Sequence, residues 1–220
     1  MVTRIIVSVL LVVAAFGCNR TISKEDQQAI NEELRSREIR RITDAQIYDA
    51  AMKLGEMIAD SSQRTLGKQL MHQVNENGTI AALEYCNLNA YPIIDSLSEF
   101  FNADIKRTSL RSRNPMDNPD ELEGQLLDAY QYNVENSLEL SPGIQKLDDG
   151  KYLYTKPIIA NSGLCLQCHG EIGTDITDEV AAVIQERYPE DNATGHQIND
   201  LRGMWSIKLD QKAIIETIDF

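Results

Sequence analysis

The sequence contains the pentapeptide Cys165-Leu166-Gln167-Cys168-His169. This C-x-x-C-H spacing is the signature at which a c-type haem is attached. Two thiols three positions apart lie on one side of a helical turn, so each can form a thioether with a haem vinyl group, while the adjacent imidazole binds the iron. The pentapeptide predicts one covalently bound haem c, with Cys165 and Cys168 as anchors and His169 as an axial ligand.

Three other roles for the cysteine pair are a disulfide, a thioredoxin-like redox pair and half of a zinc site. Zinc would need a second ligand pair at comparable spacing, and a thioredoxin fold would place C-x-x-C early, after a first strand. This motif lies near the carboxyl end of a 220-residue chain with only four cysteines and three histidines. We therefore favour haem c.

The amino terminus is typical of an export signal. Arg4 is followed by an almost entirely apolar segment at residues 5–16, too short to span a bilayer, and then by Gly17 and Cys18. A cysteine after a small residue at this point is where lipoproteins are cleaved and acylated. We expect residues 1–17 to be a lipoprotein signal peptide and Cys18 to carry a lipid that attaches the protein to the membrane.

The residues around Cys18 also bear on location. Asn19 is not the usual inner-membrane retention residue, so we expect an outer-membrane lipoprotein on the periplasmic side. Phe16 is bulky where a small residue is usual, which leaves plain secretion or a retained anchor as the alternative. Either way the compartment is oxidising, which suits haem c attachment.

Cys86 is then the one cysteine without a role. An unpaired thiol in an oxidising compartment is unusual and indicates a specific function. Ala82 and Ala90 lie four residues on either side of it and share its helical face. A flat face of small side chains around one thiol suits a macrocycle lying against it, but an inert buried cysteine fits equally well. Other candidates for the second axial position, which could also be empty, are Met71, Met116, Met204, His72 and His196.

Four segments, in order, resemble the blocks of the Tll0287-like haem-binding family. They are residues 84–94 (EYCNLNAYPII), 107–121 (RTSLRSRNPMDNPDE), 164–170 (LCLQCHG) and 188–206 (YPEDNATGHQINDLRGMWS). The resemblance implies an α+β, PAS-like fold, with an antiparallel sheet and flanking helices, that carries one c-type haem. It also implies His169 and Cys86 as the two axial ligands. His196 departs from the family, in which an aromatic residue is frequent at this position.

The rest of the chain shows no second domain or repeat. We expect a polar helical linker at residues 19–44 and one haem domain at residues 45–220. Long amphipathic helices begin the domain, and their apolar stripe packs on the core or forms a dimer interface. We expect amphipathic helices within 21–73, a break at Gly78-Thr79 and a helix around Cys86. Further helices are expected over 119–136 and over 178–188, where Thr177 caps the start and Pro189 stops the end. The expected strands cover 103–113, 152–159 after a hairpin turn at Asp149-Gly150, and 203–209 at the end.

Charge limits the partners. The formal net charge of −13 excludes nucleic acid as a natural ligand and suits transient docking to a basic protein. Haem propionates need cations, and an extended strand would place Arg107, Arg111 and Arg113 on one side.

Two functions follow from these features. With both axial positions filled and no acid–base pair elsewhere, we expect an electron-transfer cytochrome rather than an enzyme, acting with a redox partner that the sequence does not name. A redox- or gas-sensing module that signals through a separate partner is the alternative, and a haem-dependent enzyme is the least favoured.

Overall fold

The computed structural model describes residues 23–37 and 42–218, and the predicted lipidation site Cys18 lies outside them. The chain divides into two units, Met1–Ile42 and Thr43–Phe220, and the first contains the helix α2 (Lys24–Arg37). The second unit contains α3 (Asp44–Phe101), β1 (Asp104–Thr108), a 3₁₀ turn (Pro115–Asp117), α4 (Glu121–Glu135), β2 (Gly143–Lys146), β3 (Tyr152–Ile159), α5 (Gly163–His169), α6 (Asp178–Arg187), β4 (Leu201–Leu209) and α7 (Gln211–Glu216). Within the described residues, no helix is both long and apolar enough to cross a membrane.

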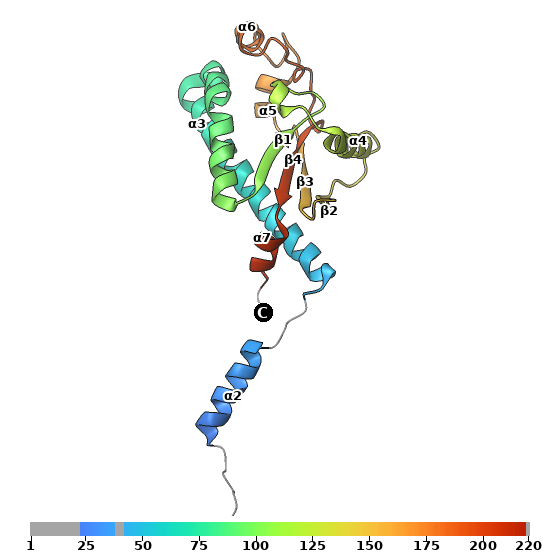
Figure 1. Cartoon of the computed structure of the whole chain (residues 1–220). Coiled ribbons are helices and arrows are strands. Elements are labelled where there is room, and N and C mark those ends of the chain that lie inside the picture. The colour runs from blue at the N-terminus through green and yellow to red at the C-terminus, as the bar shows by residue number, and fades with distance from the viewer. Residues whose placement is uncertain (1–22, 38–41, 219–220) are drawn as a thin grey trace, which may run out of the picture. The chain divides into compact units, whose positions relative to one another are not determined.

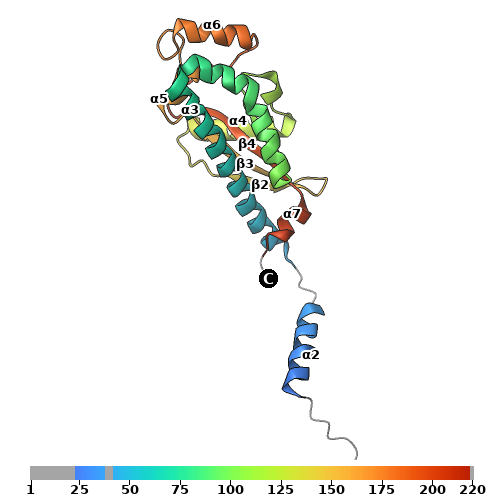
Figure 2. The same cartoon turned by 90° about the vertical axis from the view of Figure 1, so that its left-hand side faces the viewer.

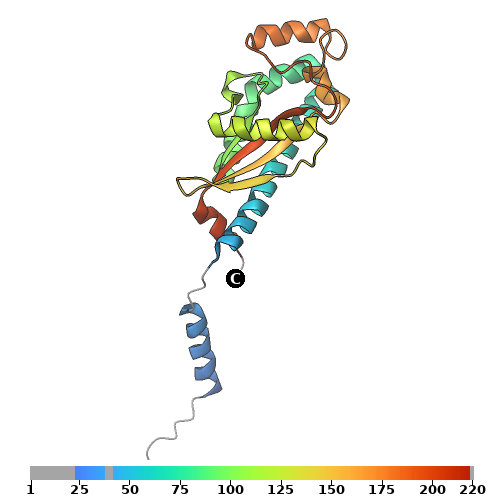
Figure 3. The same ribbon diagram turned by 90° about the vertical axis from the view of Figure 1, so that its right-hand side faces the viewer.

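A four-stranded antiparallel sheet in the order β1-β4-β3-β2 forms the centre of the second unit (Figure 1). Its two faces follow the alternation of side chains along each strand. On β3, Tyr154 packs against α3, whereas Thr155 contacts Tyr130 of α4 on the opposite face. Figure 3 shows α4 lying across one face of the sheet with the first half of α3 behind it. The predicted α+β class and the antiparallel sheet with flanking helices are confirmed.

The long helix α3 bends sharply at Gly78, which divides it into a first arm before the bend and a second arm after it. The two arms run side by side over one face of the sheet (Figure 2). Gly78 has φ 83° and ψ 173°, a conformation that only glycine adopts readily. The first arm approaches the sheet closely because Gly55 has no side chain, and a Cβ there would lie 2.3 Å from the Tyr154 ring. The break expected at Gly78 and the helix around Cys86 are both confirmed.

The helix ends agree with the capping signals in the sequence. Asp120 and Glu123 form a capping box at the start of α4, and Thr177 caps α6, as its position predicted. The hairpin turns at Gly150 as expected. One boundary was wrong: the strand expected to reach residue 113 ends at Thr108, because Ser109 turns away to hydrogen-bond Arg202.

Candidate haem site

A cavity between the two arms of α3, the sheet and α5 gathers the predicted site residues. Its walls include Cys86, Cys165, Cys168 and His169. The empty space in this cavity, its open mouth included, is about 1230 Å³. The thiols of Cys86, Cys165 and Cys168 are all free. The fold thus brings together four side chains that are up to 83 residues apart in sequence, between positions 86 and 169.

The C-x-x-C-H motif forms α5, and hydrogen bonds fix the carbonyl end of this short helix. The Arg113 guanidinium donates to the carbonyl oxygen of Cys168 at 2.5 Å. The backbone N–H groups of His196 and Gly195 donate to the carbonyls of His169 and Gly170 at 2.8 and 2.7 Å. These carbonyls have no partners within the helix, so the loop that satisfies them also fixes where His169 points.

The His169 ring has a partner that leaves its other nitrogen available. Nδ1 lies 2.9 Å from the carbonyl oxygen of Ala193, which has no proton to give, so Nδ1–H is the donor and Nε2 keeps its lone pair. The Arg202 Nε lies 3.2 Å from the same Nδ1. Because both nitrogens then carry a proton, Arg202 acts on the His169 ring through its charge and not through a hydrogen bond. Burial first, then Arg202 and Arg113, hold the pKa of His169 well below its usual value. The imidazole is neutral, as a metal ligand must be.

Opposite α5, the second arm of α3 presents the flat face that the sequence predicted. Ala82, Cys86 and Ala90 all line the cavity, and both alanines are buried. Burial raises the pKa of the Cys86 thiol, while Arg107 and then Arg113 act in the opposite direction. The thiolate form at Cys86 therefore needs a further positive charge nearby, such as a metal ion.

The competing axial candidates do not line this cavity. Met71, Met116 and His72 lie on the surface, and Met204 packs against α4 on the other face of the sheet. His196 is buried, but it lines a different cavity. Among the candidates from the sequence, Cys86 is the one whose side chain faces the cavity of His169.

The predicted arginines divide into three roles. Arg107 lines the cavity and lies over the Trp205 ring, 6.0 Å from its centroid, with no carboxylate partner among the described residues. Arg113 is buried and pairs with Asp191 at 2.8 Å, so its charge is already used. Arg111 does not line this cavity, because the chain has left the strand before it and its guanidinium donates to the carbonyls of Asn192 and Thr194. The expectation that the three lie on one side is wrong for Arg111.

Sequence reasoning missed Arg202. Between Leu201 and Gly203 the pairing of β4 with β3 slips by one residue, so Arg202 is the extra residue of a bulge. Bulges re-aim side chains, and this one directs the guanidinium into the cavity. Burial, then Arg113 and Arg107, lower the pKa of Arg202 to about 10, so it stays charged near neutral pH without a carboxylate partner among the described residues. Arg202 lies just before the closing strand expected over 203–209, which in the structure begins at Leu201, and a bulge has no clear signature in the sequence.

These features fit a haem. The cavity has thiols at the vinyl-attachment spacing, a neutral imidazole with one free nitrogen, and a thiol on a flat opposite wall. It also contains two cations without acidic partners, at Arg107 and Arg202, where the two propionates of a haem would be neutralised.

The fold and cavity define an α+β protein with a cavity built around a C-x-x-C-H helix. The chain belongs to the Tll0287-like family, whose model matches residues 20–209. A solved structure described as the cyanobacterial haem protein Tll0287 is 24% identical and covers 72% of this chain and 95% of its own, with a TM-score of 0.49. No curated protein matches.

Proposed function

We propose that the protein is an exported mono-haem c-type cytochrome that transfers electrons. In this proposal Cys165 and Cys168 hold the haem through thioethers, and His169 and Cys86 bind its iron from opposite sides. The observation that carries the proposal is the convergence of these four side chains on one cavity. Membership of the Tll0287-like family supports haem as the occupant.

A bound haem supplies one-electron chemistry. The residues of the chain set how it is used. The Nδ1–H donation from His169 to Ala193 fixes the ring at the cavity wall and leaves Nε2 with its lone pair. A thiolate from Cys86 donates electron density and favours the ferric state, so we expect a low reduction potential. With both axial positions filled by the protein, no position is left for a substrate, which favours electron transfer over catalysis.

A redox or gas sensor is the second candidate, and one observation favours it. His169 lies on α5, whereas Cys86 lies on a separate arm beyond the Gly78 bend. Burial raises the pKa of the Cys86 thiol, so its thiolate form would depend on the positive charge of a bound iron. If that charge decreased on reduction, Cys86 would bind less tightly, and its release would leave room for a small molecule.

Export and attachment are also part of the proposal, supported by residues 1–18. Cleavage before Cys18 and its acylation would place the protein on the periplasmic side of the membrane, where an acidic surface suits docking of a basic redox partner. The test is incorporation of labelled palmitate into wild type and Cys18→Ser. We expect label only in wild type, and equal labelling would reject lipidation.

The haem assignment is tested by staining for haem after denaturation. Wild type should keep its haem, whereas the double variant Cys165→Ser/Cys168→Ser should lose it on denaturation. The ligand assignment is tested with Cys86→Ala, which should keep covalent haem, lose its thiolate spectral features and rise in potential. Met71→Ala, an exposed candidate outside the cavity, is the matched control and should change nothing. An unchanged spectrum in Cys86→Ala would reject Cys86 as a ligand.

Electron-exchange kinetics separate the two candidates. A carrier should exchange electrons rapidly with the same ligands in both oxidation states. A sensor should change its ligands or its oligomeric state on reduction, which stopped-flow spectra and sedimentation of the reduced and oxidised protein would detect.

A further inference from the structure

A second cavity lies behind the proximal histidine, and the proposed cytochrome function does not use it. Its walls come from the loop after β1, from α4 and from the start of β4, and they include His196, Arg111 and Gln131. It holds about 690 Å³ of empty space, its mouth included. None of its lining residues lines the cavity of Cys86 and His169. We call it the His196 cavity.

His196 is the feature that points to a ligand. Its side chain is only 2% exposed, and neither ring nitrogen has a hydrogen-bond partner. Its nearest acidic oxygen, Oδ2 of Asp200, lies 3.9 Å from Nδ1 and instead accepts a hydrogen bond from the Gln197 N–H. A buried polar group without a partner is unfavourable, so a group in the cavity is expected to satisfy it.

The charges around His196 favour an anion. Arg111 and Arg202 both act on the His196 ring, and neither has a carboxylate partner among the described residues. Arg111 uses Nε and one terminal nitrogen on backbone carbonyls, which leaves its second terminal nitrogen free to donate. Asp200 is the one acidic residue in the lining, and its side chain is 41% exposed at the rim.

The remaining wall is apolar. Leu110, Leu127 and Leu201 line the cavity beside the polar groups, and Leu127 and Leu201 are buried in the cluster between α4 and β4. An inorganic anion would contact only the polar side of the cavity, whereas a carboxylate with a short aliphatic chain would also contact the leucines, of which Leu110 is exposed.

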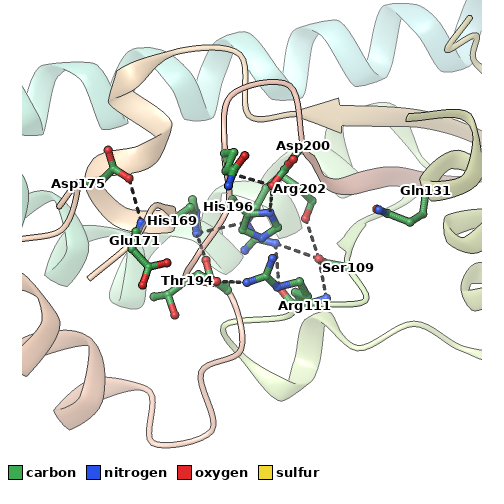
Figure 4. Close-up of polar contacts among 12 residues, drawn as sticks. Ser109, Arg111, Gln131, His169, Glu171, Asp175, Thr194, His196, Asp200 and Arg202 are labelled. Carbon is green, nitrogen blue, oxygen red and sulfur yellow. Dashed lines mark hydrogen bonds and ion pairs between the residues drawn. The ribbon is translucent and has the colours of Figure 1, made fainter. Parts of the chain in front are cut away.

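We propose that the His196 cavity binds a small aliphatic monocarboxylate, held by the Arg111 guanidinium and the His196 ring with its chain against the leucines. The guanidinium of Arg202 lies between this cavity and the His169 ring. Arg202 donates to Ser109 Oγ and the Arg111 carbonyl at 3.0 and 3.1 Å, and its Nε faces His169 Nδ1 (Figure 4). An anion in the cavity would offset positive charge next to His169 and lower the haem potential. This second effect rests on the proposed haem function.

The site is tested by titration calorimetry on the purified full-length protein, with sodium butyrate as the probe. Butyramide, which has the same shape but no charge, is the ligand control. We expect butyrate to bind and butyramide to bind at least tenfold more weakly, because hydrogen bonds to a charged group are stronger than those to a neutral one. Equal binding of the two, or no binding of butyrate, would overturn the anion site.

Variants locate the binding. His196→Phe keeps a buried ring but removes both nitrogens, and Arg111→Gln removes the charge, so each should weaken butyrate binding about tenfold or more. Arg187→Gln removes an exposed arginine outside the His196 cavity lining and should bind butyrate as wild type does. Should Arg111→Gln fail to fold, Gln131→Glu places a negative charge in the lining from α4 and should also weaken binding. Unchanged affinity in His196→Phe would reject the assignment.

The link to the haem is measured separately, as the reduction potential with and without saturating butyrate. A fall in potential that is absent in His196→Phe supports the link. Binding without any change in potential would reject the link and keep the site. Absence of covalent haem would reject the proposed function, whereas the calorimetric result would still decide the site.

Discussion

The two walls of the cavity are built in opposite ways. On the α5 wall, the last carbonyls of the motif helix receive hydrogen bonds from the Arg113 side chain and from the Gly195 and His196 backbone. On the opposite wall, Cys86 lies on the helical arm that follows the bend at Gly78, and this arm packs through apolar contacts, with Leu83 in a buried cluster with Ile176, Val180 and Ile184. The motif wall is therefore held by hydrogen bonds to its carbonyl groups, whereas the Cys86 wall is held mainly by apolar packing beyond a glycine bend. In the proposed haem site, the two axial ligands would be positioned by these two different kinds of contact.

The largest effect is expected on the α5 wall. His169→Ala removes the imidazole that the α5 contacts position, so we expect loss of haem incorporation or a high-spin product. Haem content and the absorption spectrum of the purified variant measure this. A variant with wild-type haem content and a low-spin spectrum would show that His169 is not the proximal ligand.

The next effect concerns the ion pair that holds the motif. Arg113→Met leaves the Asp191 carboxylate buried without its partner, at 8% exposure, so we expect a loss of about 3–5 kcal/mol in the free energy of unfolding. Arg187→Met breaks the exposed pair with Glu84 on the other wall and should cost at most about 1 kcal/mol. Urea unfolding of both variants measures the difference. Equal losses would contradict the distinction between the walls.

A smaller effect is expected at the bend. Gly78→Ala forces a side chain into a conformation that glycine alone favours and should cost about 1–3 kcal/mol. The control is Gly124→Ala in α4, where a Cβ has open space around it and should stabilise the helix slightly. If Gly78→Ala is as stable as wild type, the bend does not depend on this residue.

A more gradual effect is expected from pH. Burial first, then Arg111 and Arg202, lower the pKa of His196 from 6.5 to about 4. Between these values the unfolded chain binds more protons than the folded one, so stability should fall as the pH decreases from about 6.5 to about 4. Urea unfolding across this range measures it, and His196→Phe should flatten the slope. An unchanged slope in that variant would assign the acid sensitivity to other groups.

The sequence predicted the motif helix, the break at Gly78, the capped helices and the small-residue face around Cys86, because each depends on local residue types. It did not predict the end of β1 or the role of Arg202. Both depend on the pairing of β4 with its neighbours, where Ser109 donates to the Arg202 carbonyl and a bulge turns Arg202 inward. Contacts between strands that are far apart in the sequence leave little local pattern.

The same limit applies to the arginines. Residue type, together with the alternation expected of an extended strand, selected Arg107, Arg111 and Arg113 as cations for propionates. Only the fold shows that Asp191 neutralises Arg113 and that Arg111 faces another cavity.

The measurement that tests the account most directly is the absorption and EPR spectrum of the purified protein, ferric and ferrous, with carbon monoxide added to the reduced form. Ligation by His169 and Cys86 predicts a low-spin ferric signal with thiolate character. Persistence of that ligation on reduction, with resistance to carbon monoxide, would identify a carrier, and ready binding of carbon monoxide would favour the sensor. A high-spin ferric signal, or a low-spin signal without thiolate character, would contradict the central claim.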